Sequence, residues 1–375
     1  AAGPPGTPLR ATPYLTARRT GLDRRTPSAD ADVADRIRPR PEVPPACIVG
    51  GGFLSVTDSP TGPDRAMPEP PLPEGVAFGP RRTDALGTAC RPFRYFSADG
   101  LVLAGRDHGP GDPALTPLLC LPGLTRNGRD FEPVAARFAA TRRVVSLDLR
   151  GRGASEASPD GSGYDPMTEA ADVIAGLDRL EIDRAAFLGT SRGGIVTMVV
   201  SVLRPERVAA AILNDIGARI EIDGLIRIRN YLAGAGSNGP ADWPAAVQAT
   251  KAAVGLAFPD LDAAAWERFA RRIWRDRGGR PVIDYDPAVA RSLDALTPDM
   301  PPIDLGGPFA GLAGKPVMTI RGELSNILSA ATVTDMAARH PGMVTVTVPR
   351  QGHAPLLEDA PTLDAIAAFL DGLPG

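Results

Sequence analysis

The sequence has few of the residues that build metal sites and disulfide scaffolds. Its 375 residues include only three cysteines and three histidines. The cysteines, Cys47, Cys90 and Cys120, are odd in number and follow no metal-ligand spacing. They argue against a cysteine-based zinc site and a disulfide scaffold, and they favour a reducing compartment. We therefore expect a cytoplasmic protein that uses no metal ion and no organic cofactor.

Long apolar runs and an excess of basic charge are also missing. No stretch reaches the roughly 18 apolar residues that a membrane-spanning helix needs. The formal net charge is -3, and almost all basic residues are arginine, because only Lys251 and Lys315 are lysine. This balance predicts neither a nucleic-acid partner nor an anionic-membrane surface. The remaining composition, 43% hydrophobic and 23% charged, is typical of a soluble globular enzyme.

Proline is concentrated near the N-terminus, with 16 of the 40 prolines in residues 1–85. This segment has no sustained helical or strand period, so it cannot bury enough apolar surface to offset the entropy of ordering it. We expect residues 1–85 to be a disordered or non-native extension. The first methionine is Met67, which leaves open whether residues 1–66 belong to the native protein.

From about residue 91 onward, segments with strand and helix patterns alternate. Asp99-Gly100 predicts a hairpin turn between strands at Phe93–Phe96 and Leu101–Arg106. Later, short continuous apolar runs predict strands that are covered on both faces, and apolar residues three or four apart predict helices. The predicted strands are 117–121, 143–147, 185–188, 208–213, 316–320 and 344–348, and the predicted helices are 131–140, 168–180, 195–203, 330–338 and 363–370. This alternation predicts an α/β fold with a doubly wound, mostly parallel sheet.

Residues 217–311 interrupt the alternation with a mainly helical pattern. All three tryptophans, Trp243, Trp266 and Trp274, lie in this segment. We interpret it as a helical cap inserted after the sixth strand, between a first core part at 91–216 and a second at 312–375. Its aromatic residues either line an apolar pocket under the cap or form the insertion's own small core, and both can be true together.

The segment Gly189-Thr190-Ser191-Arg192-Gly193 is a G-x-S-x-G motif between a predicted strand and a predicted helix. A turn this sharp holds the serine in a strained conformation and presents its hydroxyl at the carboxyl edge of the sheet. The motif alone is weak, since a glycine-rich chain often contains it by chance, and the strand–turn–helix context is what makes it specific. The alternative is that Ser191 only caps the helix.

A serine hydroxyl becomes a nucleophile when a base takes its proton. His353 follows the last predicted strand, in a loop that a doubly wound sheet can bring over the nucleophile. His108 lies near the N-terminal hairpin and His340 at a helix end, so we expect both to be structural. The sequence thus predicts Ser191 as nucleophile and His353 as general base.

Four motifs in this order resemble the α/β-hydrolase superfamily, in its cap-bearing branch of esterases, lactonases and C–C hydrolases. Besides the Ser191 motif and Gly352-His353, they are Leu121-Pro122-Gly123-Leu124, with proline where histidine is usual, and the D-x-R-G-x-G-x-S loop at residues 148–155. The resemblance covers residues 93–372. It implies that the backbone N–H groups of Leu124 and Arg192 form an oxyanion hole, where two donors stabilise the charge on the substrate's carbonyl oxygen.

The acid of the catalytic triad is where the sequence departs from this family. Asn326 stands in the loop after the seventh strand, where related sequences tend to have aspartate. An asparagine accepts the histidine N–H but brings no charge to stabilise the imidazolium. Asp215, at the end of the sixth strand, is our first candidate, although it can also serve to cap the start of the cap segment. Glu323, which is close to the seventh strand, ranks second, and a triad without a charged acid ranks last.

Three functions fit these residues, and the first is a serine hydrolase that cleaves a small ester or lactone through an acyl-enzyme intermediate. The second uses the same pair on a carbon–carbon bond beside a ketone, with Arg192, Arg227 or Arg229 holding a second carboxylate. The third is a ligand-binding protein of this fold without catalysis.

The Arg192 side chain has two possible roles: it either steers an acidic substrate or pairs with a surface carboxylate. Haloalkane dehalogenation is disfavoured, because the residue at the motif is serine and not aspartate. The sequence leaves the substrate and the oligomeric state open.

Overall fold

The computed structural model describes residues 76–234 and 239–373. Its main sheet has the order β1-β3-β4-β6-β5-β7-β8-β13-β14, with β2 paired to β3. The strands are β1 (Ala77–Phe78), β2 (Arg82–Thr83), β3 (Ala89–Phe96), β4 (Val102–Asp107), β5 (Leu118–Leu121), β6 (Val144–Asp148), β7 (Ala185–Thr190), β8 (Val208–Asn214), β9 (Arg219–Ile220), β10 (Trp274–Arg277), β11 (Arg280–Ile283), β12 (Ile303–Asp304), β13 (Val317–Gly322) and β14 (Val344–Val348). The α-helices are α1 (Glu132–Phe138), α2 (Pro166–Arg179), α3 (Arg192–Leu203), α4 (Ile222–Gly234), α5 (Trp243–Val254), α6 (Ala263–Ile273), α7 (Gly306–Ala310), α8 (Ala330–Arg339) and α9 (Ala360–Asp371). Short 3₁₀ helices are η1 (Gly128–Phe131), η2 (Pro205–Arg207), η3 (Gly255–Ala257) and η4 (Pro287–Leu293).

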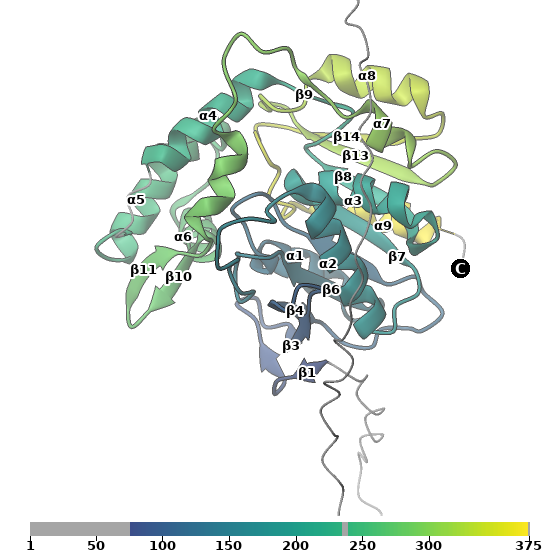
Figure 1. Cartoon of the computed structure of the whole chain (residues 1–375), viewed down its shortest axis with the longest axis horizontal. Coiled ribbons are helices and arrows are strands. Elements are labelled where there is room, and N and C mark those ends of the chain that lie inside the picture. The colour runs from purple at the N-terminus through teal and green to yellow at the C-terminus, as the bar shows by residue number, and fades with distance from the viewer. Residues whose placement is uncertain (1–75, 235–238, 374–375) are drawn as a thin grey trace, which may run out of the picture. The chain divides into compact units, whose positions relative to one another are not determined.

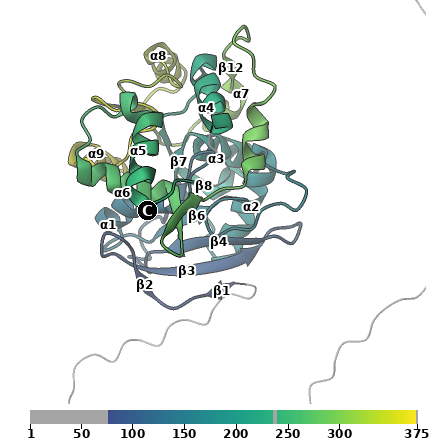
Figure 2. The same cartoon turned by 90° about the vertical axis from the view of Figure 1, so that its left-hand side faces the viewer.

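The sheet is antiparallel at its beginning and parallel in the rest. β3 and β6 both pair antiparallel with β4, and every later pair from β6–β5 to β13–β14 is parallel. Figure 2 shows β3 and β4 at one end of the sheet and α8 at the opposite end. When the two-residue strands β1 and β2 are left out, β8 is the sixth strand in chain order. The predicted α/β fold with its doubly wound, mostly parallel sheet is confirmed.

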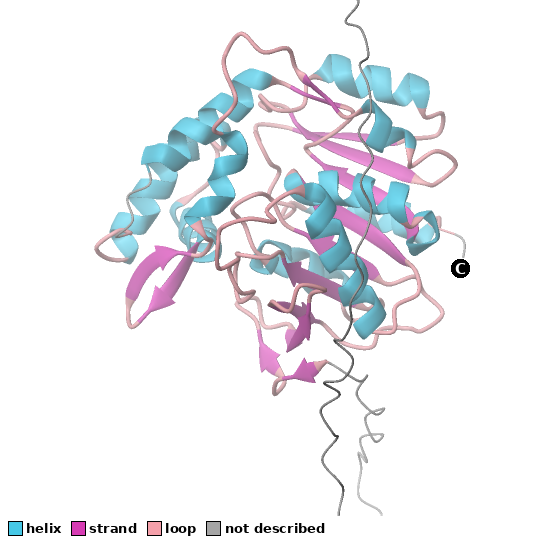
Figure 3. Ribbon diagram, in the orientation of Figure 1, coloured by secondary structure: helices cyan, strands magenta, loops and turns pink. Residues whose placement is uncertain are grey.

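Alternate residues of β5 show how the helices cover both faces of the sheet (Figure 3). Leu119 and Leu121 join the apolar core shared with α2 and α3, whereas Leu118 and Cys120 join the core shared with α1 and α9. All four side chains are buried. Since successive strand residues point to opposite faces, a continuous apolar run is what a strand covered on both sides requires.

The predicted hairpin is present as β3 and β4, and Gly100 takes the positive φ of +87° that its turn needs.

The prediction that residues 1–85 are disordered or non-native has a different outcome in two parts of the segment. Residues 1–75, including Met67, lie outside the described residues. For residues 76–85 the expectation of disorder is wrong, because β1 pairs with β3 and Val76 is buried. A two-residue strand has no period of its own, and Val76 is buried because it joins the apolar core that includes Phe93 and Tyr95 of β3.

Between β8 and β13 the chain forms α4, α5, α6 and the β10–β11 hairpin, which lie together beside the sheet at the left of Figure 1. The hairpin was not predicted, although Gly278 and Gly279 mark its turn with positive φ angles of 62° and 86°. Trp274 packs with Ala246 and Ala270, and Trp266 packs with Phe258 and Phe269. The tryptophans therefore belong to the small core of this segment itself.

Candidate active site

Ser191 sits at a sharp turn between β7 and α3. Its backbone has φ 51° and ψ −112°, and its side chain makes no capping hydrogen bond to the helix. The neighbouring glycines are needed for space: a Cβ on Gly193 would lie 2.0 Å from the Leu121 carbonyl oxygen, and one on Gly189 would lie 2.5 Å from the Gly193 backbone. A non-glycine residue with positive φ stores strain, which persists where the surrounding structure enforces it. The alternative that Ser191 is only a helix cap does not match this geometry.

His353 lies between Ser191 and Asp215. Its Nε2 is 2.9 Å from Ser191 Oγ, and its Nδ1 is 2.8 Å from Asp215 Oδ2. A carboxylate accepts hydrogen bonds, so the ring proton of His353 lies on Nδ1, and this N–H donates a hydrogen bond to Asp215 Oδ2. Nε2 is then free to accept the proton of the Ser191 hydroxyl. The structure therefore brings together the serine, the histidine and the first-ranked acid of the sequence analysis.

Asp215 follows β8 directly and is fully buried, with a positive φ of 56°. Besides His353, its carboxylate accepts a hydrogen bond from the Gly322 N–H at 2.9 Å and one from Ser325 Oγ at 2.6 Å. Both donors belong to β13 or the loop after it, where the family's acid is expected. That loop contributes hydrogen-bond donors to Asp215 in place of a carboxylate. Among the described residues, both carboxylate oxygens of Asp215 are thus bonded to the site, and no backbone N–H at the start of the cap segment bonds to them.

Glu323 and Asn326 are not brought to the histidine. Glu323 is exposed, and its Oε2 accepts a hydrogen bond from the Arg350 N–H at 2.7 Å. Asn326 lies against α4, since a Cβ on Gly224 would be 2.3 Å from the Asn326 carbonyl oxygen. Within the described residues, no hydrogen bond joins either side chain to His353.

The other two histidines are remote from Ser191, as expected for structural residues. His108 is buried with its Nδ1 3.9 Å from Asp84 Oδ2, and burial lowers the pKa of His108 to about 4. His340 Nε2 lies 3.1 Å from the Leu312 carbonyl oxygen. Neither side chain lines the pocket that contains Ser191.

The loop after β5 runs close to the serine. A Cβ on Gly123 would lie 3.8 Å from Ser191 Cβ, and Leu124 lines the same pocket. Arg192 is the first residue of α3, so its N–H has no acceptor within the helix. The Arg192 side chain is buried and donates to Glu169 Oε2 and to the Tyr164 carbonyl oxygen, each at 2.6 Å. It therefore pairs with a carboxylate, as one of the two alternatives supposed, but this carboxylate is buried and not at the surface.

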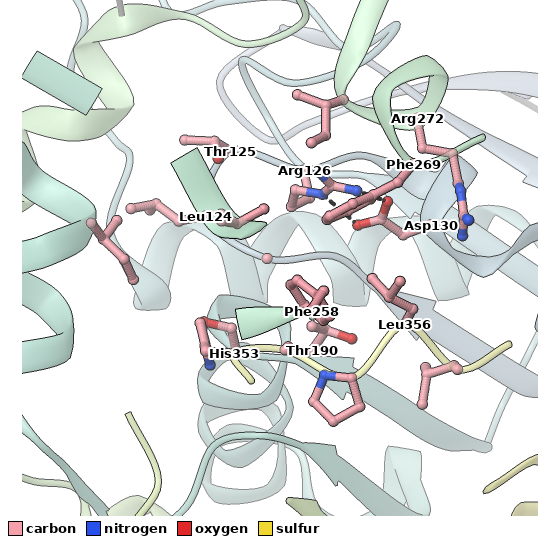
Figure 4. Close-up of a pocket in the computed structure, with 18 of the residues that line it drawn as sticks. Leu124, Thr125, Arg126, Asp130, Thr190, Phe258, Phe269, Arg272, His353 and Leu356 are labelled. Carbon is pink, nitrogen blue, oxygen red and sulfur yellow. Dashed lines mark hydrogen bonds and ion pairs between the residues drawn. The ribbon is translucent and has the colours of Figure 1, made fainter. Parts of the chain in front are cut away.

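A cavity of about 170 Å³ opens beside Ser191 and His353. This volume is close to the ~150 Å³ of an engineered apolar cavity that accepts benzene, so it has room for a short acyl chain. Figure 4 shows that its wall comes from the loop after β5, from the His353 loop and from the segment between β8 and β13. From that segment come Ile228, Tyr231, Leu232, Val254, Phe258, Phe269, Arg272, Ile273 and Tyr285. Phe258 and Phe269 both line the cavity and pack with Trp266, so the two roles weighed for these aromatic residues hold together.

Two ion-paired arginines, Arg126 and Arg272, lie at one end of the cavity (Figure 4). Arg126 pairs with Asp130, with its Nε 2.8 Å from Oδ2, and its guanidinium carbon lies 4.9 Å from the centroid of the Phe269 ring. Arg272 lines the same end, where its Nη2 donates to Glu358 Oε1, and burial lowers the pKa of its guanidinium to about 10. The charged groups that line the cavity are thus two arginines and one aspartate.

The comparison with known protein families agrees with this geometry. The model of the alpha/beta hydrolase family matches residues 118–365. The chain belongs to the α/β-hydrolase family. The predicted membership of the α/β-hydrolase superfamily is thereby confirmed, and the family match supports a hydrolase.

Its relatives include two hydrolases of named substrates. The 3-hydroxybutyrate-oligomer hydrolase of Cupriavidus necator is 31% identical over an alignment of 281 positions that covers 71% of this chain and 92% of the relative. The 2-(acetamidomethylene)succinate hydrolase of Mesorhizobium japonicum is 29% identical over 68% of this chain and 87% of its own length. Among solved structures, an α/β-hydrolase from Novosphingobium aromaticivorans is similar with a TM-score of 0.70 and 40% identity, covering 75% of this chain and 98% of that one.

Two further residues of the site carried no signal in the sequence of this α/β-hydrolase. Ser325 binds Asp215, and Asn214 Nδ2 donates to Thr190 Oγ1 and to the Pro355 carbonyl oxygen, both at 3.0 Å. These contacts link loops that are far apart along the chain, so only the fold brings them together.

Over the described residues, no group of three or more histidine, cysteine or acidic side chains is arranged to hold a metal ion. No helix in that same part of the chain has the length and apolarity to cross a membrane.

Proposed function

We propose that this α/β-hydrolase is a serine hydrolase that cleaves small carboxylic esters through an acyl-enzyme intermediate. The observation that carries the proposal is the hydrogen-bonded series Asp215–His353–Ser191, with distances of 2.8 and 2.9 Å, at the wall of a cavity. A base within hydrogen-bond reach of a serine hydroxyl, and itself oriented by a third group, is the arrangement that nucleophilic catalysis requires.

In the first half of the reaction, Ser191 Oγ attacks the ester carbonyl carbon while His353 Nε2 takes the hydroxyl proton. Asp215 holds the ring through Nδ1 and stabilises the imidazolium that forms. The N–H groups of Leu124 and Arg192 donate to the oxygen of the tetrahedral intermediate. His353 then protonates the departing alcohol, and the acyl group remains on Ser191.

In the second half, a water molecule takes the place of the alcohol. His353 removes a proton from this water as it attacks the acyl carbon, and the same two N–H groups stabilise the second oxyanion. The proton returns to Ser191 Oγ as the acid leaves. Residues 217–311 act in this scheme as a cap that supplies much of the substrate-facing wall, with the hydrolase core at residues 91–216 and 312–375.

The substrate class follows from the cavity. Its apolar wall and its volume of about 170 Å³ favour a short acyl part. We expect a substrate carboxylate to share Arg126 with Asp130 or Arg272 with Glu358. The names of both relatives, 3-hydroxybutyrate-oligomer hydrolase and 2-(acetamidomethylene)succinate hydrolase, denote derivatives of small carboxylic acids. We therefore favour an ester of a small hydroxy acid over a lactone.

The C–C hydrolase alternative has weaker support. It needs a cation to hold a second carboxylate, and none of the three arginines named for that role lines the cavity. The two arginines that do line it, Arg126 and Arg272, are paired with Asp130 and Glu358. Arg192 binds Glu169, Arg229 donates to the Leu296 carbonyl oxygen, and Arg227 is exposed and outside the cavity lining. The third alternative, ligand binding without catalysis, does not explain why a serine, a histidine and a buried aspartate are hydrogen-bonded in series.

The test is hydrolysis of p-nitrophenyl butyrate and of a 3-hydroxybutyrate dimer by the full chain, beside its Ser191→Ala variant. A fluorophosphonate probe, which labels an activated serine, is applied to both proteins and the labelled residue is located by mass spectrometry. We expect turnover and labelling at Ser191 in the wild type, and neither in the variant. A folded wild type that is neither labelled nor faster than Ser191→Ala on any ester would overturn the proposal.

A further inference from the structure

A buried ion-pair network connects the two residues whose N–H groups we assign to the oxyanion hole. Glu169, on α2, is fully buried and binds a different arginine with each carboxylate oxygen. Arg152 Nη1 donates to Glu169 Oε1 at 2.7 Å, and Arg192 Nε donates to Glu169 Oε2 at 2.6 Å. One carboxylate thereby fixes the positions of two guanidinium groups.

The first arginine holds the loop after β5. Arg152 Nε donates to the Leu124 carbonyl oxygen at 2.7 Å, and Nη1 also donates to the Arg150 carbonyl oxygen at 2.6 Å. The Arg152 side chain is fully buried, so water does not compete for these bonds. Because the carbonyl and the N–H of Leu124 flank the same Cα, fixing the carbonyl restricts the direction in which the N–H points.

The second arginine holds the start of α3. Arg192 Nη2 donates to the Tyr164 carbonyl oxygen at 2.6 Å, so its side chain has two anchors, Tyr164 and Glu169. The side chain does not line the cavity, whereas the residue's N–H starts the helix next to Ser191. Its guanidinium therefore acts on the reaction through the backbone that carries it.

We propose that Glu169 is a positioning residue for the oxyanion hole: through Arg152 and Arg192 it fixes the directions of the Leu124 and Arg192 N–H groups. This inference rests on the proposed function, in which those two groups stabilise the intermediate. Oxyanion stabilisation is sensitive to geometry, because loss of one donor typically lowers turnover about 10²–10³-fold and a misplacement of roughly 1 Å can cost on the order of 10²-fold.

The chain offers a matched control on the same helix. Asp172 is buried on α2 and binds Arg150 through Nε at 2.6 Å and through Nη2 at 2.7 Å. The other partner of the Arg150 side chain is Asp99, and over the described residues that side chain makes no hydrogen bond to Leu124 or Arg192. Asp172→Asn therefore weakens a comparable buried ion pair two residues from Arg152 and leaves the bonds of Glu169 to Arg152 and Arg192 in place. Its link to the network is the Arg150 carbonyl oxygen, which accepts from Arg152 Nη1 through the backbone and not through the Arg150 side chain.

The experiment compares Glu169→Gln and Asp172→Asn with the wild type, well below their melting temperatures. It measures kcat and KM for p-nitrophenyl butyrate, and the inhibition constant of a butyl boronic acid, whose serine adduct places an oxygen in the oxyanion hole. For Glu169→Gln we expect kcat to fall about 10- to 100-fold with KM within threefold of wild type. The inhibition constant should rise in proportion to the fall in kcat. For Asp172→Asn we expect a loss of thermal stability with both readouts within threefold of wild type.

An active wild type whose Glu169→Gln variant keeps its kcat and boronate affinity overturns this inference alone, and so does an equal loss of both in Asp172→Asn. A wild type without esterase activity or boronate binding overturns the proposed function and this inference with it. If Glu169→Gln does not fold, Arg192→Lys gives the same test, because an ammonium cannot reproduce the two-pronged contact with Glu169 and Tyr164.

Discussion

Asp215 Oδ2 lies 2.8 Å from His353 Nδ1, although 138 positions separate the two residues in the chain. The aspartate comes from the end of β8, and the loop after β13 supplies donors to it from Gly322 and Ser325. Asp215 thus reaches the histidine ring from the strand next to β13, after which the resemblance to the family leads us to expect the acid. Parallel neighbouring strands end at the same sheet edge, which makes the two positions interchangeable in space.

The identity of the acid is tested by Asp215→Asn beside Glu323→Gln. We expect Asp215→Asn to lower kcat on the order of 10⁴-fold, because the asparagine brings no charge to the imidazolium and can hold the wrong tautomer. Glu323→Gln should stay within twofold of wild type, since Glu323 is exposed and bonded to Arg350. Steady-state kinetics with p-nitrophenyl butyrate measures both, and a larger loss in Glu323→Gln would reverse the assignment.

The strained backbone of Ser191 predicts that the turn which holds the serine lowers the free energy of unfolding. Ser191 has a φ of 51°, which glycine adopts without cost and alanine does not. Ser191→Gly should therefore have a free energy of unfolding about 1 kcal/mol higher than Ser191→Ala, and both should be inactive. Urea unfolding followed by circular dichroism measures the difference. Equal stability of the two variants would mean that the turn is not strained.

The cavity size predicts a limit on acyl chain length. Leu232 is nearly buried in the cavity wall, so Leu232→Ala should open space for longer chains. We expect the ratio of kcat/KM for octanoyl over butyryl esters to rise on the order of tenfold. Leu256→Ala is the control, because Leu256 is 94% exposed and outside the cavity lining. An unchanged ratio in Leu232→Ala would place the acyl chain elsewhere.

The proposed sharing of Arg126 between Asp130 and a substrate carboxylate predicts a preference for acidic substrates. Arg126→Met should lower kcat/KM for a 3-hydroxybutyrate dimer at least tenfold. The charged hydrogen bond from Arg126 to the substrate carboxylate is lost, and Asp130, left unpaired, repels that carboxylate. The methyl ester of the same dimer has no negative charge and should change less than threefold. Arg271→Met, whose arginine is exposed and pairs with Glu267, is the control. Equal losses for the acid and its methyl ester would contradict a role for Arg126 in binding the carboxylate.

The buried His108 predicts an acid-sensitive stability. Its pKa of about 4 in the folded chain lies below its ordinary value, so between about pH 6.5 and 4 the unfolded chain binds a proton that the folded chain does not. Stability is therefore full above that window and falls by on the order of 3 kcal/mol as the pH drops through it. His108→Gln should flatten this dependence, as measured by urea unfolding at pH 7, 5.5 and 4.5. A variant with the wild-type slope would show that other groups cause it.

Much of the site followed from local sequence. Ser191 and His353 were identified because a strained strand–turn–helix needs small residues around the serine, and because only three histidines competed for the role of base. The strands were predictable for a similar reason, since burial on both faces leaves a short continuous apolar run such as Leu118–Leu121. These are requirements of the nearest neighbours along the chain, so the chain itself records them.

What only the tertiary structure decided depends on contacts between distant segments. The sequence could rank Asp215 and Glu323 but not choose, because both follow strands that end at the same sheet edge, and the direction of each side chain is set by packing. Neither Ser325 beside Asp215 nor Glu169 between Arg152 and Arg192 belongs to a motif. A buried polar group takes whichever partner the fold brings within about 3 Å, and that choice leaves no period or spacing in the sequence.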